Sequence, residues 1–112
     1  MMERVAYKVL DADEFAGLQR GGWRGAAIDL QDGFIHLSAA DQLTETVAKH
    51  FAGRTNLIVA AVDLAMLGDS VRWEESRGGA LFPHIYGALP PAAVIAHTPL
   101  SRNADGEVVR PG

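Results

Sequence analysis

Two short runs of the sequence place a histidine and a second polar residue inside otherwise apolar segments. The first, Asp-Gly-Phe-Ile-His-Leu-Ser, contains His36 and Ser38, and the second, Leu-Phe-Pro-His-Ile-Tyr-Gly, contains His84 and Tyr86. Strand side chains alternate between faces, so the two polar residues of each run share a face. Burying such groups costs free energy unless they are hydrogen-bonded or hold a ligand. The two pairs therefore predict one concave polar site that all four residues line.

Each of these residues also has a purely structural interpretation. His36 and His84 could be buried histidines bonded to backbone carbonyls, and the Tyr86 hydroxyl could simply reach the surface. Ser38 is followed by Asp41 in a Ser-x-x-Asp pattern, which predicts that Ser38 caps a helix. A helix start beside a histidine is also a ready anion site, so capping and ligand contact are compatible at Ser38.

A second polar segment, Val-Arg-Trp-Glu-Glu, is predicted as a strand at residues 71–75. Arg72 and Glu74 then share one face and Trp73 lies on the other. The common interpretation is a solvated edge strand with ion pairs across it. In a site, Arg72 would bind an anionic group while Glu74 orients a hydroxyl.

Other kinds of chemistry have little support in the sequence. The chain has no cysteine, and a metal site would need His36, His84 and a carboxylate to converge. We therefore expect no metal site. Ser38 lacks the Gly-x-Ser-x-Gly context of a hydrolase nucleophile, and no glycine-rich phosphate loop is present.

The elements that must position these residues follow from hydrophobic periodicity and capping signals. Asp11 and Glu14 form a capping box that predicts a short helix ending at the Gly-Gly pair of residues 21–22. Apolar residues at helical spacing predict an amphipathic helix from about residue 40 to residue 51. The apolar run at residues 57–62 predicts a central strand buried on both faces. From these patterns we expect the core to include Leu43, Val47, Phe51, Leu57, Ile58, Val59 and Val62.

Further strands are predicted in the segments 5–10, 34–37, 84–86 and 93–97. The predicted fold class is α+β, with five to six mostly antiparallel strands in a continuous or split sheet and about two helices. We expect one compact domain over residues 1–112, with an ordered core at about 4–100 and a polar, weakly ordered tail at 101–112.

Bulk composition narrows the class of protein further. The 112 residues are 48% hydrophobic and 21% charged, which is typical of one globular domain. A net charge of −4 argues against general nucleic-acid binding, although a single phosphate pocket needs only one or two arginines. The first ten residues lack the apolar core of a signal peptide, and no apolar stretch is long enough to span a bilayer. We expect a cytoplasmic protein with no membrane partner.

Through these motifs, the sequence resembles a family of small bacterial proteins known as domain of unknown function family 952. That family carries the Asp-Gly-Phe-Ile-His-x-Ser run, then Arg-Trp-Glu, then Phe-Pro-His-Ile-Tyr-Gly, as this chain does. The resemblance extends from about Tyr7 to Leu100. Relatives often have histidine where this chain has Lys8.

The resemblance implies a compact relative of the ADP-ribosyltransferase fold. In that fold a histidine followed by a small hydroxyl residue holds a ribose of NAD, and His36 and Ser38 match this motif. An aromatic residue stacks on nicotinamide, a role open to Tyr86 or Trp73. A glutamate often orients the ribose for glycosidic attack, which would fall to Glu74 or the adjacent Glu75.

The predicted function is an NAD-utilising enzyme that transfers ADP-ribose or hydrolyses NAD, with NAD as substrate rather than as a bound cofactor. The alternative is a non-catalytic module that binds a nucleotide or small metabolite. A glutamate beside the bound ribose would separate the two, because only the enzyme needs it. The predicted catalytic residues are His36 and Glu74, and the predicted ligand-binding residues are Ser38, Arg72, His84 and Tyr86.

Overall fold

The first of two sheets has its most apolar strand in the middle. The protein was examined as a computed structural model, which describes residues 3–112 apart from the side chain of Arg77. In spatial order the strands are β1 (Val5–Asp11), β3 (Leu57–Asp63) and β6 (Val94–Pro99), and both pairings are antiparallel. Residues 59–62 of β3 are all buried, because both faces of the strand are covered. The predicted central strand is confirmed.

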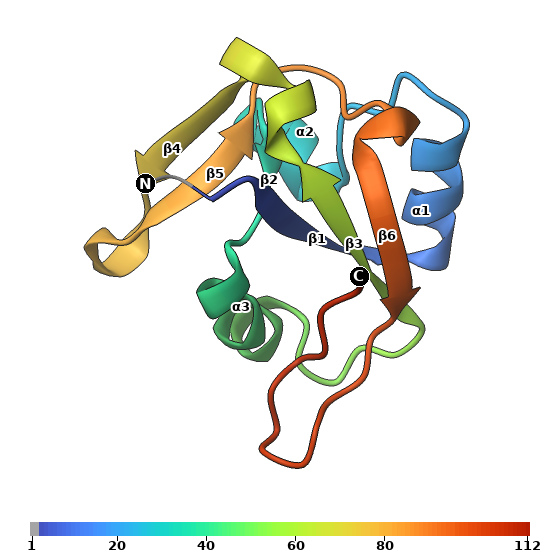
Figure 1. Cartoon of the computed structure of the whole chain (residues 1–112), viewed down its shortest axis with the longest axis vertical. Coiled ribbons are helices and arrows are strands. Elements are labelled where there is room, and N and C mark those ends of the chain that lie inside the picture. The colour runs from blue at the N-terminus through green and yellow to red at the C-terminus, as the bar shows by residue number, and fades with distance from the viewer. Residues whose placement is uncertain (1–2) are drawn as a thin grey trace.

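The second sheet carries the two histidine motifs. Its strands, again in spatial order and antiparallel, are β2 (Ile35–His36), β5 (Leu81–Ile85) and β4 (Val71–Glu75). Tyr7 and Ser38 join the sheets, since the Tyr7 amide donates to the Ser38 carbonyl at 2.8 Å and the Ser38 amide donates back at 2.9 Å. The six strands therefore form a split antiparallel sheet, and the β4–β5 hairpin projects from the body (Figure 1).

Three α-helices lie within the described residues, one more than the sequence predicted. They are α1 (Ala12–Gln19), α2 (Ala27–Asp32) and α3 (Leu43–His50). The capping box is present as predicted: the Asp11 side chain accepts from the Glu14 amide, and the Glu14 side chain accepts from the Asp11 amide. Short 3-10 turns complete the chain at Ala40–Gln42, Leu64–Met66, Gly68–Ser70, Arg77–Gly79 and Pro91–Ala93.

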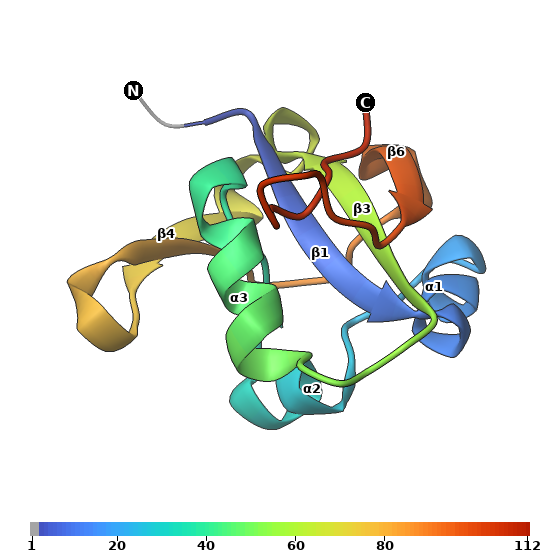
Figure 2. The same ribbon diagram turned by 90° about the horizontal axis from the view of Figure 1, so that it is seen from below.

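The first sheet lies between two apolar layers. On one face, Phe15 and Leu18 of α1 pack with Ile35 and Ile85 of the second sheet. On the other face, α3 packs across β1 (Figure 2). Of the predicted core residues, Phe51 and Ile58 are only half-buried. The other five are buried as expected: Leu43, Val47, Leu57, Val59 and Val62.

The C-terminal segment differs from the expectation of a weakly ordered tail. It folds back along the body, and Val108 is buried in the same apolar layer as Leu43 and Val47. The Val108 amide also donates to the Thr44 hydroxyl of α3 at 2.9 Å. One apolar side chain and one long-range hydrogen bond therefore hold a segment whose composition is otherwise polar.

The whole arrangement is a compact α+β domain of antiparallel sheets with few helices. In the part of the chain that the structure describes, no helix combines the length and the apolar character needed to cross a membrane.

Candidate functional site

The two histidines of the sequence motifs are direct neighbours in the second sheet. His36 of β2 pairs with His84 of β5 in the strand register, and the centroids of their rings lie 5.5 Å apart. The His84 side chain is buried, whereas the His36 side chain is 35% exposed. The register of the β2–β5 pair thus brings residues that are far apart in the sequence to one place on the sheet.

Phe34 sits at the centre of the rings. Its ring stacks on His84 with centroids 4.1 Å apart and lies 4.7 Å from His36 and 5.3 Å from Tyr86. We call Phe34, His36, His84 and Tyr86 the ring cluster. Phe34 is not among the predicted site residues, although the sequence contains a signal for it: Phe34 precedes His36 by two residues, and alternation places both on one face.

Glu74 supplies a carboxylate to this cluster. Its Oε1 accepts a hydrogen bond from the Tyr86 hydroxyl at 2.7 Å and lies 2.7 Å from Nδ1 of His84. Hydrogen bonding to His84, and then to Tyr86, lowers the pKa of Glu74 below its ordinary value. The hydrogen bond between Glu74 and Tyr86 raises the pKa of the Tyr86 hydroxyl. Glu74 is therefore ionised at neutral pH, in a half-exposed position.

The alternation of β4 separates the other polar residues of this strand. Glu75 follows Glu74, is exposed and belongs to the opposite face, so Glu74 is the carboxylate that meets the rings. The Arg72 guanidinium lies 4.9 Å from the Tyr86 ring centroid and covers one of its faces. Trp73 packs against the apolar layer beneath the sheet, which leaves Tyr86 and Phe34 as the aromatic groups of the site.

Ser38 is placed differently from the sequence prediction. Its hydroxyl lies 2.8 Å from Oγ1 of Thr46 in α3, and within the described residues no hydrogen bond joins it to the rings. The predicted helix cap is wrong. Ala39 precedes the first turn, and the Gln42 side chain accepts from the Ala39 amide at 2.9 Å. The chain crosses to the first sheet at Ser38, which turns the hydroxyl toward α3.

Beneath the ring cluster lies a network of charges that the sequence analysis missed. Asp29 is fully buried, and its carboxylate lies 2.9 Å from Lys8 Nζ and 2.6 Å from Nδ1 of His36. The same carboxylate accepts hydrogen bonds from the amides of His36 and Ala26. Lys8 also donates to the His36 carbonyl at 2.9 Å. Every polar atom of this network therefore has a partner, as buried charges require.

Burial and charge act in opposite directions on the acid of the network. Burial alone would raise the pKa of Asp29, but the hydrogen bond from His36 and the charge of Lys8 override it and hold that pKa at about 2. Burial lowers the pKa of Lys8 against the pull of Asp29. A signal for Lys8 existed in the sequence: it falls on the same strand face as Ala6 and Leu10, both buried.

His36 is tied to carboxylates at both ring nitrogens. Nδ1 faces buried Asp29, and Nε2 lies 3.0 Å from Oδ2 of Asp32, which is exposed. The two carboxylates therefore fix the orientation of the His36 ring at the border of the cluster.

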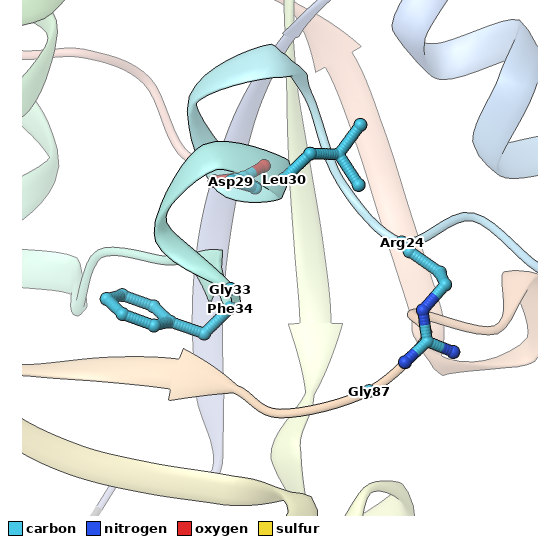
Figure 3. Close-up of a pocket in the computed structure, with 6 residues that line it drawn as sticks. All are labelled: Arg24, Asp29, Leu30, Gly33, Phe34 and Gly87. Carbon is cyan, nitrogen blue, oxygen red and sulfur yellow. The ribbon is translucent and has the colours of Figure 1, made fainter.

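A pocket of about 200 Å³ adjoins the ring cluster. Figure 3 shows the Arg24 side chain extended toward Gly87, and the Phe34 ring pointing away from these two residues. Backbone of Gly33 and Gly87 borders this space, and a Cβ at either position would meet no atom within 4 Å. Phe34 belongs both to the lining of the pocket and to the ring cluster, so the two adjoin at this residue. Asp29 and Leu30 complete the lining.

Comparisons with known proteins describe relatives without a stated activity. A family model described as "Protein of unknown function (DUF952)" matches residues 9–97. The crystal structure of protein CC0527 from Caulobacter crescentus is 44% identical, with a TM-score of 0.84 and coverage of 94% of this chain and 93% of that one. The solution structure of CC0527 is also 44% identical, with a TM-score of 0.78 and coverage of 94% and 91%. No protein with a curated description matches the chain.

Proposed function

The chain belongs to the DUF952 family of proteins of unknown function, and we propose that it is an NAD-utilising enzyme that breaks the bond between nicotinamide and ribose. The product ADP-ribose is passed to an acceptor or to water. The proposal includes the ADP-ribosyltransferase-like fold that the sequence resemblance implies.

The observation that carries the proposal is the position of Glu74. Its Oε1 is held by His84 and Tyr86, while Oε2 has no hydrogen bond to any described residue. Cleavage of a glycosidic bond develops positive charge on the ribose, and a carboxylate held in place stabilises that charge. The lowered pKa of Glu74 keeps this carboxylate ionised at neutral pH, which is the form that the reaction requires.

In the proposed reaction, the bond between the ribose C1′ and the nicotinamide nitrogen breaks. Its electron pair leaves with the nicotinamide, which is released as a neutral molecule. The ribosyl cation then accepts an electron pair from water or from an acceptor nucleophile, which gives up a proton to solvent. Glu74 stabilises the cation, and the half-buried Phe34 and the exposed Tyr86 offer apolar surface to the flat nicotinamide.

One observation favours a second candidate, a non-catalytic binding module for a nucleotide. Both ring nitrogens of His36 are already bonded to carboxylates, so the histidine that the resemblance assigns to the ribose is held within the protein. A binding module needs the rings and the pocket but makes no use of Glu74 as an ionised group.

Release of nicotinamide tests the two candidates. The intact protein is incubated with millimolar NAD, and free nicotinamide is quantified by chromatography. We expect release by the natural protein and a loss of about 100-fold or more in Glu74→Gln, since the transition-state charge loses its partner. Glu75→Gln is the matched control, because it makes the same change one residue away on the other face of β4.

Two results contradict the enzyme. The first is no nicotinamide release by folded protein at any acceptor tested, and the second is equal release by Glu74→Gln and the natural protein. Calorimetric binding of NAD without release would instead support the binding module, with Glu74→Gln binding NAD as tightly as the natural protein does.

A further inference from the structure

The pocket beside the ring cluster contains a cation that the proposed chemistry has not used. Arg24 lies in the connection between α1 and α2 and is exposed. Among the described side chains, which leave out that of Arg77, no ion pair involves Arg24. Most other arginines of the described part of the chain likewise form no ion pair, and Arg24 differs from them because it lines the pocket.

The acid next to Arg24 does not repel an anion. Asp29 also lines the pocket, but its carboxylate is bonded to Lys8, to the His36 ring and to two backbone amides. The negative charge of Asp29 is therefore compensated from within the protein. Arg24 is the charged group of the lining that remains available to a ligand.

The walls of the pocket leave room for a compact group. Gly33 ends α2 in a left-handed conformation with φ of 87°, and Gly87 follows Tyr86 with φ of 153°. Neither residue places a side chain in the pocket, so a ligand can approach the backbone closely. The volume of about 200 Å³ is below the roughly 300–1,000 Å³ of pockets that enclose a whole drug-sized ligand. The pocket therefore fits one part of a nucleotide, not all of it.

We infer that Arg24 binds a phosphate group of the nucleotide ligand in this pocket, while the flat ring of the ligand lies on the ring cluster. Gly87 connects the ring cluster to the pocket, because it directly follows Tyr86 of the cluster and borders the pocket. A guanidinium bonds phosphate oxygens through two N–H groups at once, which suits a diester or pyrophosphate. The inference rests on the proposed function for the identity of the ligand and selects phosphorylated nucleotides over nucleosides.

Calorimetry with ADP-ribose and with adenosine tests this inference. We expect the natural protein to bind ADP-ribose at least about 10-fold more tightly than adenosine, since a charge-assisted bond to phosphate is lost in the nucleoside. Arg24→Gln should remove that difference and leave adenosine binding unchanged. Arg20→Gln is the matched control, because Arg20 is also exposed, lies four residues earlier and does not line the pocket.

Inorganic phosphate distinguishes a nucleotide site from a site for the free anion. For a nucleotide site, millimolar phosphate should compete only weakly with ADP-ribose. Phosphate that binds as tightly as ADP-ribose would overturn the nucleotide assignment. Equal affinity of Arg24→Gln and the natural protein for ADP-ribose would overturn the role of Arg24, as would no binding of ADP-ribose by folded natural protein.

The failure of this inference can be told apart from that of the proposed enzyme. If the natural protein releases nicotinamide and Arg24→Gln keeps the same KM for NAD, the enzyme stands and the phosphate subsite is wrong. If Arg24 controls the preference for ADP-ribose but no nicotinamide is released, the subsite stands and the enzyme is wrong. Thermal melting of Arg24→Gln verifies its fold, which a substitution at an exposed position should preserve.

Discussion

The buried carboxylate of Asp29 lies 2.6 Å from Nδ1 of His36, so a ring at the surface of the protein is held from its interior. Lys8 balances the charge of Asp29 on its other oxygen at 2.9 Å. This connection couples the first sheet, which contributes Lys8, to the second sheet, which contributes His36. The orientation of the His36 ring therefore depends on Asp29 of α2 and on Lys8 of β1, two residues that come from separate elements.

Asp29→Asn should be strongly destabilising. The substitution removes the charge that compensates Lys8, and breaking a buried ion pair at one partner costs about 3–5 kcal/mol. Urea unfolding followed by circular dichroism measures this cost. Asp32→Asn is the control, because it removes the exposed carboxylate on the same histidine and should cost less than about 1 kcal/mol. Equal effects of the two variants would show that the buried network contributes no more than a surface contact.

Acid should weaken the fold through the same residue. The pKa of Asp29 is about 2 in the folded protein against an ordinary value of 3.8, so the folded state binds fewer protons. The stabilisation is therefore complete above about pH 4 and is lost as the pH falls toward 2, and it amounts to roughly 2 kcal/mol. Urea midpoints measured between pH 5 and pH 2 test this slope. Asp29→Asn should have a flatter profile, and an unchanged profile would contradict the assignment.

Gly25→Ala should disturb the network by a steric route. A Cβ at Gly25 would overlap the Cβ of Asp29, and the backbone there has φ of 125°, which L side chains rarely adopt. We expect a loss of about 1–3 kcal/mol and a shifted His36 ring resonance in NMR spectra. At the control site Gly22, φ is 71° and an added Cβ meets nothing within 4 Å. Gly22→Ala should cost less and should leave the His36 resonance in place.

The phenol of Tyr86 should report on Glu74. The hydrogen bond to Glu74 raises the pKa of Tyr86 above its ordinary value of 10.0, because deprotonation would place two negative charges together. Glu74→Gln should lower the pKa of Tyr86, whereas Glu75→Gln should leave it as in the natural protein. The Cζ chemical shift of Tyr86 in a pH titration by NMR measures both. A Tyr86 pKa that is the same in all three proteins would show that Glu74 does not bond to the hydroxyl in solution.

Local patterns determined much of the fold. The capping box at Asp11 and Glu14, the apolar stripe of α3 and the apolar run of β3 each predicted an element that the structure contains. These signals are strong because they depend on residues within a few positions of one another. Alternation along β4 likewise placed Arg72 and Glu74 together on one face, since it needs only the strand assignment.

Tertiary structure alone decided which of those residues meet. Glu74 rather than Glu75 reaches His84 because β4 pairs with β5 in one register, and a shift by one residue would exchange the two. Ser38 bonds to Thr46 because the chain leaves the second sheet there to pair with Tyr7. The local spacing of polar residues encodes neither the register of the β4–β5 pair nor the point at which the chain crosses from the second sheet to the first.

The buried charges beneath the site could not be paired from the sequence either. Lys8 and Asp29 are 21 residues apart, and neither belongs to a motif that predicts the other. A lysine on a buried strand face requires a partner, so the sequence by itself indicated that one must exist. The identity of that partner follows from the packing of α2 against the two sheets, because only packing brings distant residues within hydrogen-bond distance.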